Sequence, residues 1–303
     1  MNKNNLNIID IGTSKISYKI IGNGKIDIVV ELGLGSCIAE WYQLAKEISK
    51  KGYTVLLYER AGTGYSTISS LQRTPVNIAN ELNKLLEKLD VSDKITILAH
   101  SQGGLYAQAF TRIYKKRVKK IILLDPLSAN DNKFKELLTE EEFRKSGVDK
   151  FSSLKLQKRL ANLHLGFIIK ALMKNAPPFY YYEGFSKEEE DYILSTLTKA
   201  NLYETSMEEY KLSHDENIIA SLKEKNEFPD IPLVLITHSS EFCIKETMEF
   251  GGTTRQEAEK IEDIWQQIMK EYLNFSRESK YIQAKNSGHY IHLLEPNLIL
   301  ENL

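Results

Sequence analysis

The sequence predicts an α/β fold in which a mostly parallel sheet is covered on both faces by helices. Short apolar runs alternate with stretches of helical period over residues 1–125 and again over residues 231–303. The apolar runs lack a polar face, as do strands buried on both sides in a parallel sheet. Residues 126–230 have a helical period and no convincing strand. Because this stretch is too long for a connection, we interpret it as a helical cap inserted between two parts of the core.

The composition is that of an ordinary soluble globular protein. Of the 303 residues, 42% are hydrophobic and 27% are charged, and the net charge is −1. This balance gives no bulk electrostatic reason to expect nucleic acid or an anionic membrane as a partner. The N-terminus lacks the apolar stretch of a secretory signal, and no apolar run is long enough to span a bilayer. We therefore expect a cytoplasmic protein with no membrane partner.

The two cysteines, Cys37 and Cys243, form neither a disulfide framework nor a metal-ligand spacing. A structural position is the expectation for each of them. The sequence accordingly predicts no metal and no cofactor.

The elements of the first part of the core follow from its turns and periodicity. β-Structure is expected over residues 6–32, with strands at 16–21 and 26–32 around a Gly-Asn-Gly turn. Further strands are expected at 53–58, 95–99 and 121–124, and helices at about 39–51, 75–89 and 105–117. The second of these helices opens on Thr74-Pro75, because proline suits the first helical turn.

The second part resumes the strand–helix order after the insertion. Strands are expected at 231–237 and 280–284, a long helix at about 253–273, and a last helix from about residue 289 to the end. Within the cap, an aromatic group at residues 179–182 follows two prolines. Packing of the cap onto the core is the commoner use of such a group, and lining a substrate pocket is the alternative.

The segment at residues 94–105, Lys-Ile-Thr-Ile-Leu-Ala-His-Ser-Gln-Gly-Gly-Leu, places a reactive side chain at a strand end. Its apolar run stops at Ala99, and a helical period begins after two glycines. A serine in such a sharp turn holds its hydroxyl out of the sheet, beside helix N–H groups that can stabilise an oxyanion. Ser101 occupies this position, in a G-x-S-x-G pattern whose first glycine is Ala99. The pattern alone leaves a nucleophile and a plain loop equally open.

Ligands of parallel sheets bind at the carboxyl ends of the strands. Gly33, Glu59, Ser101 and Asp125 all lie within two residues of the end of a predicted strand. We therefore expect these residues to lie at one edge of the sheet.

The chain resembles α/β-hydrolases of the single-chain type with a helical cap. Four segments carry the resemblance: Leu-Gly-Leu-Gly (32–35), Glu-Arg-Ala-Gly-Thr-Gly-Tyr-Ser (59–66), Ala-His-Ser-Gln-Gly-Gly (99–104) and Ser-Gly-His-Tyr-Ile (287–291). They stand in the family's order and span nearly the whole chain outside the cap. The cap is similar to that of proline iminopeptidase-like and epoxide-hydrolase-like members. The resemblance implies a serine nucleophile followed in the chain by an acid and then a histidine.

A serine hydroxyl is a poor nucleophile at neutral pH and needs a base within hydrogen-bond reach. We expect His289 to be this base, because Gly288 lets its loop pass close to Ser101. The remaining histidines are expected to be structural or exposed: His100, His164, His214, His238 and His292.

Two carboxylates compete for the role of the triad acid. Family members commonly carry the acid in the loop after the strand that corresponds to 231–237, where Glu241 is the only nearby acid. Some relatives place it at the end of the preceding strand, where this chain has Asp125. We favour Asp125 and keep Glu241 as the alternative. The acid would fix the tautomer of the imidazole and stabilise the imidazolium.

The resemblance also implies an oxyanion hole formed by two backbone N–H groups. These belong to Gln102, directly after the serine, and to Leu34 in the glycine turn. Glu59 and Arg60 are expected to hold loops together rather than to contact substrate.

These residues favour a serine hydrolase that cleaves a small ester, thioester or amide through an acyl-enzyme. Epoxide hydrolases and dehalogenases need a carboxylate nucleophile, which Ser101 does not supply. The alternatives are a cofactor-free lyase or peroxidase-type reaction on the same triad, and a non-catalytic receptor that binds its ligand under the cap. The expected partner is a small-molecule substrate of a kind the sequence does not disclose.

Overall fold

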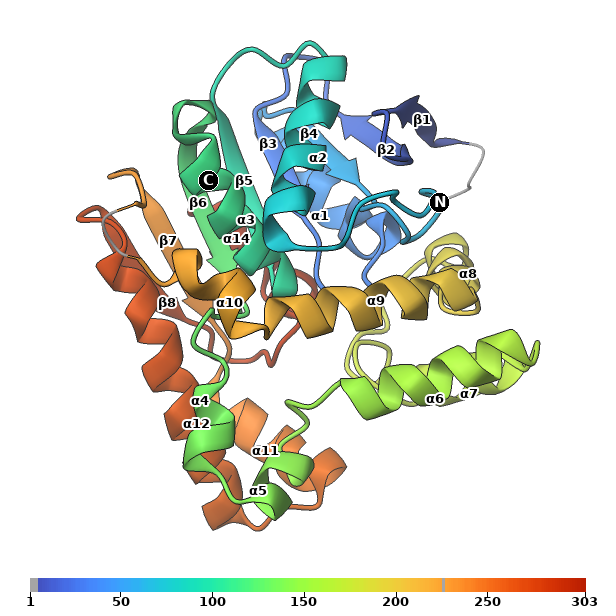
Figure 1. Cartoon of the computed structure of the whole chain (residues 1–303), viewed down its shortest axis with the longest axis vertical. Helices are drawn as coiled ribbons and strands as arrows, with labels where there is room; N and C mark the ends of the chain where they lie inside the picture. Colours follow the sequence, from blue (N-terminus) through green and yellow to red (C-terminus); the bar gives the residue numbers. More distant parts are fainter. Residues whose placement is uncertain (1–4, 225–226) are drawn as a thin grey trace.

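An eight-stranded sheet forms the centre of the molecule, in the order β1-β2-β4-β3-β5-β6-β7-β8. The computed structural model describes residues 5–224 and 227–303 (Figure 1). The strands are β1 (Asn7–Asp10), β2 (Lys15–Ile21), β3 (Ile28–Glu31), β4 (Val55–Tyr58), β5 (Ile95–His100), β6 (Val118–Leu124), β7 (Leu233–Thr237) and β8 (Ser279–Gln283). Strand β2 pairs antiparallel with β1 and with β4, and the pairs from β4 to β8 are parallel. The mostly parallel α/β fold is therefore confirmed.

Helices of the core cover both faces of this sheet. They are α1 (Ile38–Lys50), α2 (Pro75–Lys88), α3 (Gln102–Ile113), α11 (Ser240–Gly251), α12 (Arg255–Lys270), α13 (Ile291–Leu294) and α14 (Pro296–Leu300). One apolar cluster joins α2, α3 and α12 to one face, and a second joins α1 and α14 to the other. Consecutive strand residues serve opposite clusters: Val29 lies in the first and Val30 in the second, and both are buried. This explains why the strands read as continuous apolar runs.

The segment between β6 and β7 is helical in its described residues. Its helices are α4 (Lys133–Leu137), α5 (Glu140–Lys145), α6 (Phe151–Asn162), α7 (Gly166–Lys174), α8 (Lys187–Thr196), α9 (Ala200–Ser213) and α10 (Glu216–Ile219). Helix α9 crosses beneath the carboxyl ends of the parallel strands, and α6 and α7 project to the side (Figure 1). A third apolar cluster joins α6, α7 and α9, and Leu34 of the glycine turn packs against it.

Two sequence-based expectations differ from the structure. The region after β7 contains α11, which the sequence did not predict because Ile244 is the only buried residue on that helix. The last helix does not run unbroken from residue 289. It forms as the two short helices α13 and α14, divided before Pro296, which lacks the N–H that a continuous helix needs. His289 accordingly lies in the loop before α13.

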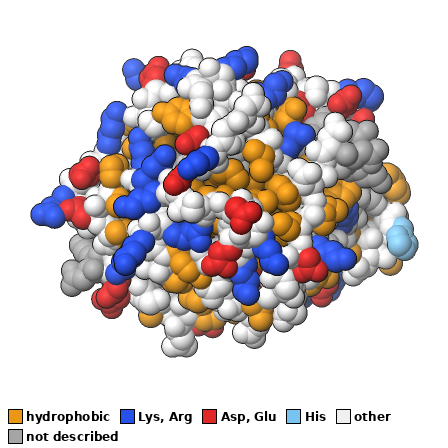
Figure 2. Space-filling model, turned by 90° about the horizontal axis from the view of Figure 1, so that it is seen from above, with side chains coloured by type: hydrophobic (Ala, Val, Ile, Leu, Met, Phe, Trp, Pro, Cys, Tyr) orange, Lys and Arg blue, Asp and Glu red, His pale blue; other side chains and the backbone are white. Residues whose placement is uncertain are grey.

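Charged side chains of both signs are interspersed over the face shown in Figure 2, with hydrophobic side chains between them. This mixture agrees with the net charge of −1. None of the described helices combines the length and the apolar character that a membrane crossing requires.

Candidate active site

Ser101 stands at the sharp junction between β5 and α3. Its backbone has φ 53° and ψ −130°, a region that non-glycine residues rarely adopt. The turn is held by its neighbours: the Ser101 N–H donates to Leu124 O at 3.0 Å, and the Ser101 carbonyl accepts from Gly104 and Leu127, each at 2.8 Å. Strained residues of this kind occur at functional sites, where the surroundings fix them.

Two glycines after Ser101 have no room for a side chain, and a third, Gly33, has little room for one. A Cβ on Gly103 would lie 2.4 Å from Glu31 O, and one on Gly104 would lie 2.4 Å from the Pro126 Cβ. A Cβ on Gly33 would lie 3.3 Å from the Cβ of Ser101. The glycine turn after β3 therefore passes directly beside the serine.

His289 arrives next to this turn on the loop after β8. Its backbone carbonyl is hydrogen-bonded to His100 Nε2 at 2.9 Å, and the two imidazole rings lie 4.5 Å apart. A Cβ on Gly288 would lie 2.7 Å from Glu246 Oε2 and 2.9 Å from the Phe242 ring, so this glycine permits a close passage of α11 and not, as the sequence suggested, of Ser101. Neither the Ser101 hydroxyl nor His289 Nε2 has a hydrogen-bond partner among the described residues. Such contacts are commonly long before substrate binds.

Asp125 lies behind His289 at the end of β6. Its Oδ2 is 2.7 Å from His289 Nδ1, and its own N–H donates to Ile236 O at 2.9 Å. The structure therefore brings the serine turn, His289 and Asp125 to one edge of the sheet, as the sequence led us to expect.

His238 is a second histidine on the same carboxylate. Its backbone N–H donates to Asp125 Oδ1 at 2.9 Å, and its Nδ1 lies 2.9 Å from Asp125 Oδ2. Its Nε2 lies 2.8 Å from Glu262 Oε2 on α12, and its ring stacks on Trp265 with centroids 3.9 Å apart. His238 thus links two buried carboxylates and is held on one ring face by an aromatic side chain.

These contacts set the charges in the site. Burial alone would raise the pKa of Asp125, but the charge and hydrogen bonds of His238 and the hydrogen bond from His289 lower it. Burial alone would lower the pKa of His238, but the charge of Asp125 raises it well above its usual value. Burial lowers the pKa of His100 to about 3, which keeps that ring neutral.

Glu241, the alternative acid, lies elsewhere. It sits in the first turn of α11 on the surface, where its carboxylate binds Arg255 Nη2 at 2.8 Å and lies 3.5 Å from Lys245 Nζ. Its described hydrogen bonds and ion pairs do not include His289.

The N–H groups of Leu34 and Gln102 flank Ser101 from the glycine turn and from α3. Neither has a hydrogen-bond partner among the described residues. Arg60 holds the carbonyls of Leu32 and Gly33, directly before the Leu34 N–H. The Gln102 side chain is hydrogen-bonded to Tyr106 and to Ser213 at the end of α9.

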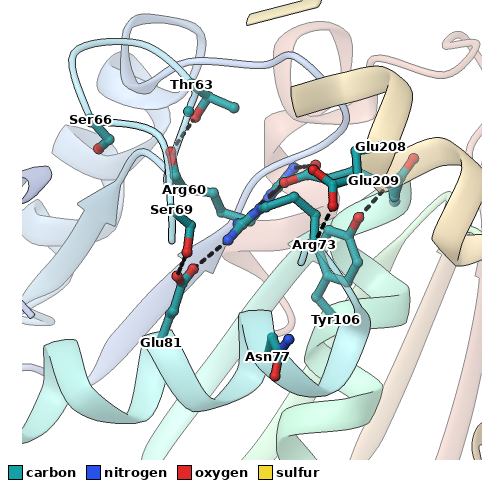
Figure 3. Close-up of polar contacts among 12 residues, drawn as sticks. Arg60, Thr63, Ser66, Ser69, Arg73, Asn77, Glu81, Tyr106, Glu208 and Glu209 are labelled. Carbon is teal, nitrogen blue, oxygen red and sulfur yellow. Dashed lines mark hydrogen bonds and ion pairs between the residues drawn. The ribbon is translucent and has the colours of Figure 1, made fainter. Parts of the chain in front are cut away.

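A buried ionic network ties α9 to this edge of the sheet. Glu209 of α9 accepts from Arg60 Nη2 at 2.9 Å and from Arg73 Nη2 at 3.4 Å. Arg60 also pairs with Glu31, and Arg73 with Glu81. Figure 3 shows the two arginines converging on the glutamate above Tyr106. The expectation that Arg60 holds loops together is consistent with these contacts.

The sequence analysis did not find His238 or Glu262 as neighbours of the site. His238 directly follows β7, where relatives commonly carry the acid, and that position was the available signal. Glu262 lies in the middle of a long helix, and nothing in the sequence relates it to His238. Among the described residues, no group of three or more His, Cys, Asp or Glu residues is arranged to hold a metal ion.

Comparison with known proteins identifies relatives of this architecture. A family model described as "alpha/beta hydrolase fold" matches residues 28–165. A protein of Gibberella zeae named "AB hydrolase superfamily protein" is 22% identical over 282 residues, which are 89% of this chain and 83% of that protein.

Two further proteins carry more specific names. The 2-hydroxy-6-oxononadienedioate/2-hydroxy-6-oxononatrienedioate hydrolase of Escherichia coli O81 is 30% identical over 166 residues, or 53% of this chain and 55% of that enzyme. The solved structure of a thermophilic esterase from Thermogutta terrifontis superposes with a TM-score of 0.63 at 16% identity, covering 98% of this chain and 96% of that one.

Proposed function

Because this chain belongs to the α/β-hydrolase superfamily and is a hydrolase, we propose that it cleaves a small carboxylic ester, or a thioester or amide, through an acyl-enzyme on Ser101. The observation that carries the proposal is the 2.7 Å contact between Asp125 Oδ2 and His289 Nδ1, on a loop that touches the residue before Ser101. This contact leaves the other ring nitrogen of His289 to serve the serine.

In this mechanism, His289 Nε2 takes the proton of the Ser101 hydroxyl as the oxygen attacks the acyl carbon. The protonated ring then gives the proton to the leaving group, and water attacks the acyl-enzyme in a second cycle. Asp125 fixes the tautomer of His289 and stabilises the imidazolium without taking the proton. Its place against His289 and the remote position of Glu241 support Asp125 as the acid.

The N–H groups of Leu34 and Gln102 would hold the oxyanion of the tetrahedral intermediate. Arg60 supports the first by fixing the two preceding carbonyls, and Tyr106 and Ser213 support the second through the Gln102 side chain. Loss of one such donor typically lowers turnover by ~10²–10³.

We assign His238 and Glu262 a positioning role. Asp125 Oδ1 accepts the His238 N–H, and its Oδ2 is shared between two imidazoles, so the carboxylate cannot rotate away from His289. The positive charge of His238 also offsets part of the negative charge that acts on the base.

The acyl group is proposed to lie under the helices between β6 and β7, which we take as the cap over residues 126–230. The E. coli relative is named for dicarboxylate substrates, which call for cations in the site. Arg60, the buried cation beside the glycine turn, is already paired with Glu31 and Glu209. This pairing favours an uncharged acyl group for the present chain.

Turnover of p-nitrophenyl esters of increasing acyl length tests the proposal. The wild type is expected to hydrolyse at least one of them, and Ser101→Ala to lose at least about a thousandfold in kcat. Ser70→Ala, an exposed serine outside the site, serves as the matched control. Equal rates for Ser101→Ala and the wild type would refute a serine nucleophile. Absence of turnover with an intact, reactive Ser101 would favour the lyase, peroxidase or receptor alternatives.

A further inference from the structure

We propose that the helical hairpin of α6 and α7 binds the surface of an anionic lipid bilayer. The hairpin comprises residues 151–174, and it projects from the side of the molecule at the right of Figure 1. This proposal rests on surface chemistry and does not depend on the proposed catalytic mechanism.

The hairpin exposes large apolar side chains that nothing in the described structure covers. Its inner face packs through Leu154, Ala161 and Ile169 against α9. Its outer surface leaves five apolar side chains exposed: Phe151 (38%), Leu156 (55%), Leu163 (68%), Phe167 (69%) and Leu172 (55%). The two most exposed of them, Leu163 and Phe167, flank the turn between the helices. The same side of the molecule carries hydrophobic side chains at the right-hand edge of Figure 2.

The positive charge of the hairpin favours an anionic bilayer as its partner. Residues 150–182 contain no acidic side chain and six basic ones, which are Lys150, Lys155, Lys158, Arg159, Lys170 and Lys174. Lys158 pairs with Glu204 and Lys174 with Glu190, at the base of the hairpin. Lys155, Arg159 and Lys170 are exposed and have no ion pair among the described residues. A cationic apolar projection complements anionic headgroups over a hydrocarbon layer, whereas a second copy of the same cationic hairpin would repel it.

The spacing of these groups also matches a bilayer surface. At about 1.5 Å of helix per residue, Arg159 lies roughly 6 Å below Leu163 along α6, and Lys170 roughly 5 Å below Phe167 along α7. Interfacial helices bury their apolar groups about 5–10 Å into the boundary between headgroups and acyl chains. With the turn of the hairpin directed into the bilayer, Leu163 and Phe167 would reach this layer while Arg159 and Lys170 stay at the level of the phosphates. Phe151, Leu156 and Leu172 lie farther from the turn and would stay outside it.

The expectation of no membrane partner came from the net charge of the whole chain and from the absence of an apolar run long enough to span a bilayer. That total averages a strongly basic hairpin with an acidic remainder, so it does not describe the local surface.

Co-sedimentation of the full chain with lipid vesicles tests the proposal. One set of vesicles is phosphatidylcholine alone, and the other contains a third of phosphatidylglycerol. The wild type is expected to bind the anionic vesicles and not the neutral ones, and to be released by high salt. The variant Lys155→Gln/Arg159→Gln/Lys170→Gln should bind about a hundredfold more weakly, since each basic residue at the surface contributes roughly fivefold.

The apolar contribution is tested with Leu163→Ser/Phe167→Ser, which should lose at least about tenfold in binding. The matched controls are Ile8→Ser, an exposed apolar residue on β1 (62%), and Lys51→Gln/Lys84→Gln/Lys88→Gln on other exposed surfaces. Both controls should bind as the wild type does, and circular dichroism should confirm that all variants are folded.

Three outcomes would overturn the proposal. The first is equal binding to neutral and anionic vesicles, or no binding to either. The second is an equal loss of binding in the control variants. The third is a dimer, measured by light scattering, that Leu163→Ser/Phe167→Ser dissociates without any vesicle binding by the wild type.

Discussion

Asp125 is the residue on which the site is centred, because its carboxylate touches two histidines and its backbone is tied to β7. A buried carboxylate with this many donors stays ionised, in agreement with its lowered pKa. It can therefore orient His289 throughout the proposed reaction.

The triad assignment predicts a ranking of three variants. His289→Ala should abolish acylation, because the proposed mechanism has no second base to take the serine proton. Asp125→Asn should lower kcat by ~10⁴, the loss seen when the acid of a triad is neutralised. Glu241→Gln should change kcat little, because its carboxylate serves Arg255 on the surface. Steady-state kinetics on one p-nitrophenyl ester gives all three values, and the reverse order for the two acids would move the role to Glu241.

The shared carboxylate also predicts a change in pH dependence. His238→Gln removes a positive charge 2.9 Å from Asp125 Oδ2, so more of the carboxylate charge stabilises the protonated base. The pH below which kcat/KM falls should then rise by about one unit, which a purely structural role would not cause. His214→Gln, at the end of α9, removes a histidine that contacts Asp131 and should leave the profile unchanged. An unshifted profile for a folded His238→Gln would contradict the positioning role.

At the scale of elements, the position of α9 is set by buried charges. The carboxylate of Glu209 is fully buried and serves two buried arginines, so it fixes the helix over the carboxyl ends of the strands. The same helix reaches Gln102 through Ser213, which couples its position to the proposed oxyanion hole.

Glu209→Gln should therefore destabilise the fold. The variant leaves Arg60 and Arg73 with one fewer negative partner in a buried place, which costs up to about 3–5 kcal/mol when a buried pair is broken. Glu208→Gln, one residue earlier on the same helix, should cost less than about 1 kcal/mol because it accepts only a backbone N–H of Arg73. Urea unfolding measures both, and similar values would show that α9 is held by other contacts.

The start of α1 makes the free energy of unfolding depend on pH. Glu40 caps the start of α1 by accepting the Cys37 N–H, and burial raises its pKa to about 7 from 4.5. The folded state binds this proton more tightly than the unfolded state. The contribution of Glu40 to the free energy of unfolding is therefore largest below pH 4.5, falls as the pH rises toward about 7, and is constant above that.

Glu40→Gln should remove this term while keeping an acceptor for the Cys37 N–H. The free energy of unfolding of the variant, relative to the wild type, should rise by on the order of 3 kcal/mol between pH 4.5 and pH 8. Denaturation by urea at a series of pH values measures the difference. A difference that stays constant with pH would contradict a raised pKa at Glu40.

At the scale of the whole molecule, the periodic parts of the chain were predictable. Strands buried on both faces, such as β5 and β7, are seen in the sequence as apolar runs. The start of α2 was predicted from Thr74 and Pro75. Helix α11 has a single buried residue, so its sequence lacks the apolar periodicity from which a helix is predicted. The break before Pro296 was visible in the sequence, and the expectation of one unbroken helix missed it.

The site was predictable only where one segment carries its own signal. Ser101 and His289 lie in short motifs whose backbone demands are local, so their places on the turn after β5 and on the loop after β8 could be expected from the sequence. The pairing of His238 with Glu262, and of Arg60 with Glu209, joins residues that are far apart in the chain or in unrelated elements. Such contacts depend on how the layers pack, which periodicity does not specify.

The central claim is that Ser101 becomes an activated nucleophile when the β5 turn, the end of β6 and the loop after β8 meet. Intact-protein mass spectrometry after treatment with a fluorophosphonate probe tests it most directly. The account predicts a single adduct that maps to Ser101, none in Ser101→Ala, and a strongly slowed reaction in His289→Ala. An adduct on another residue, or unchanged labelling without His289, would contradict it.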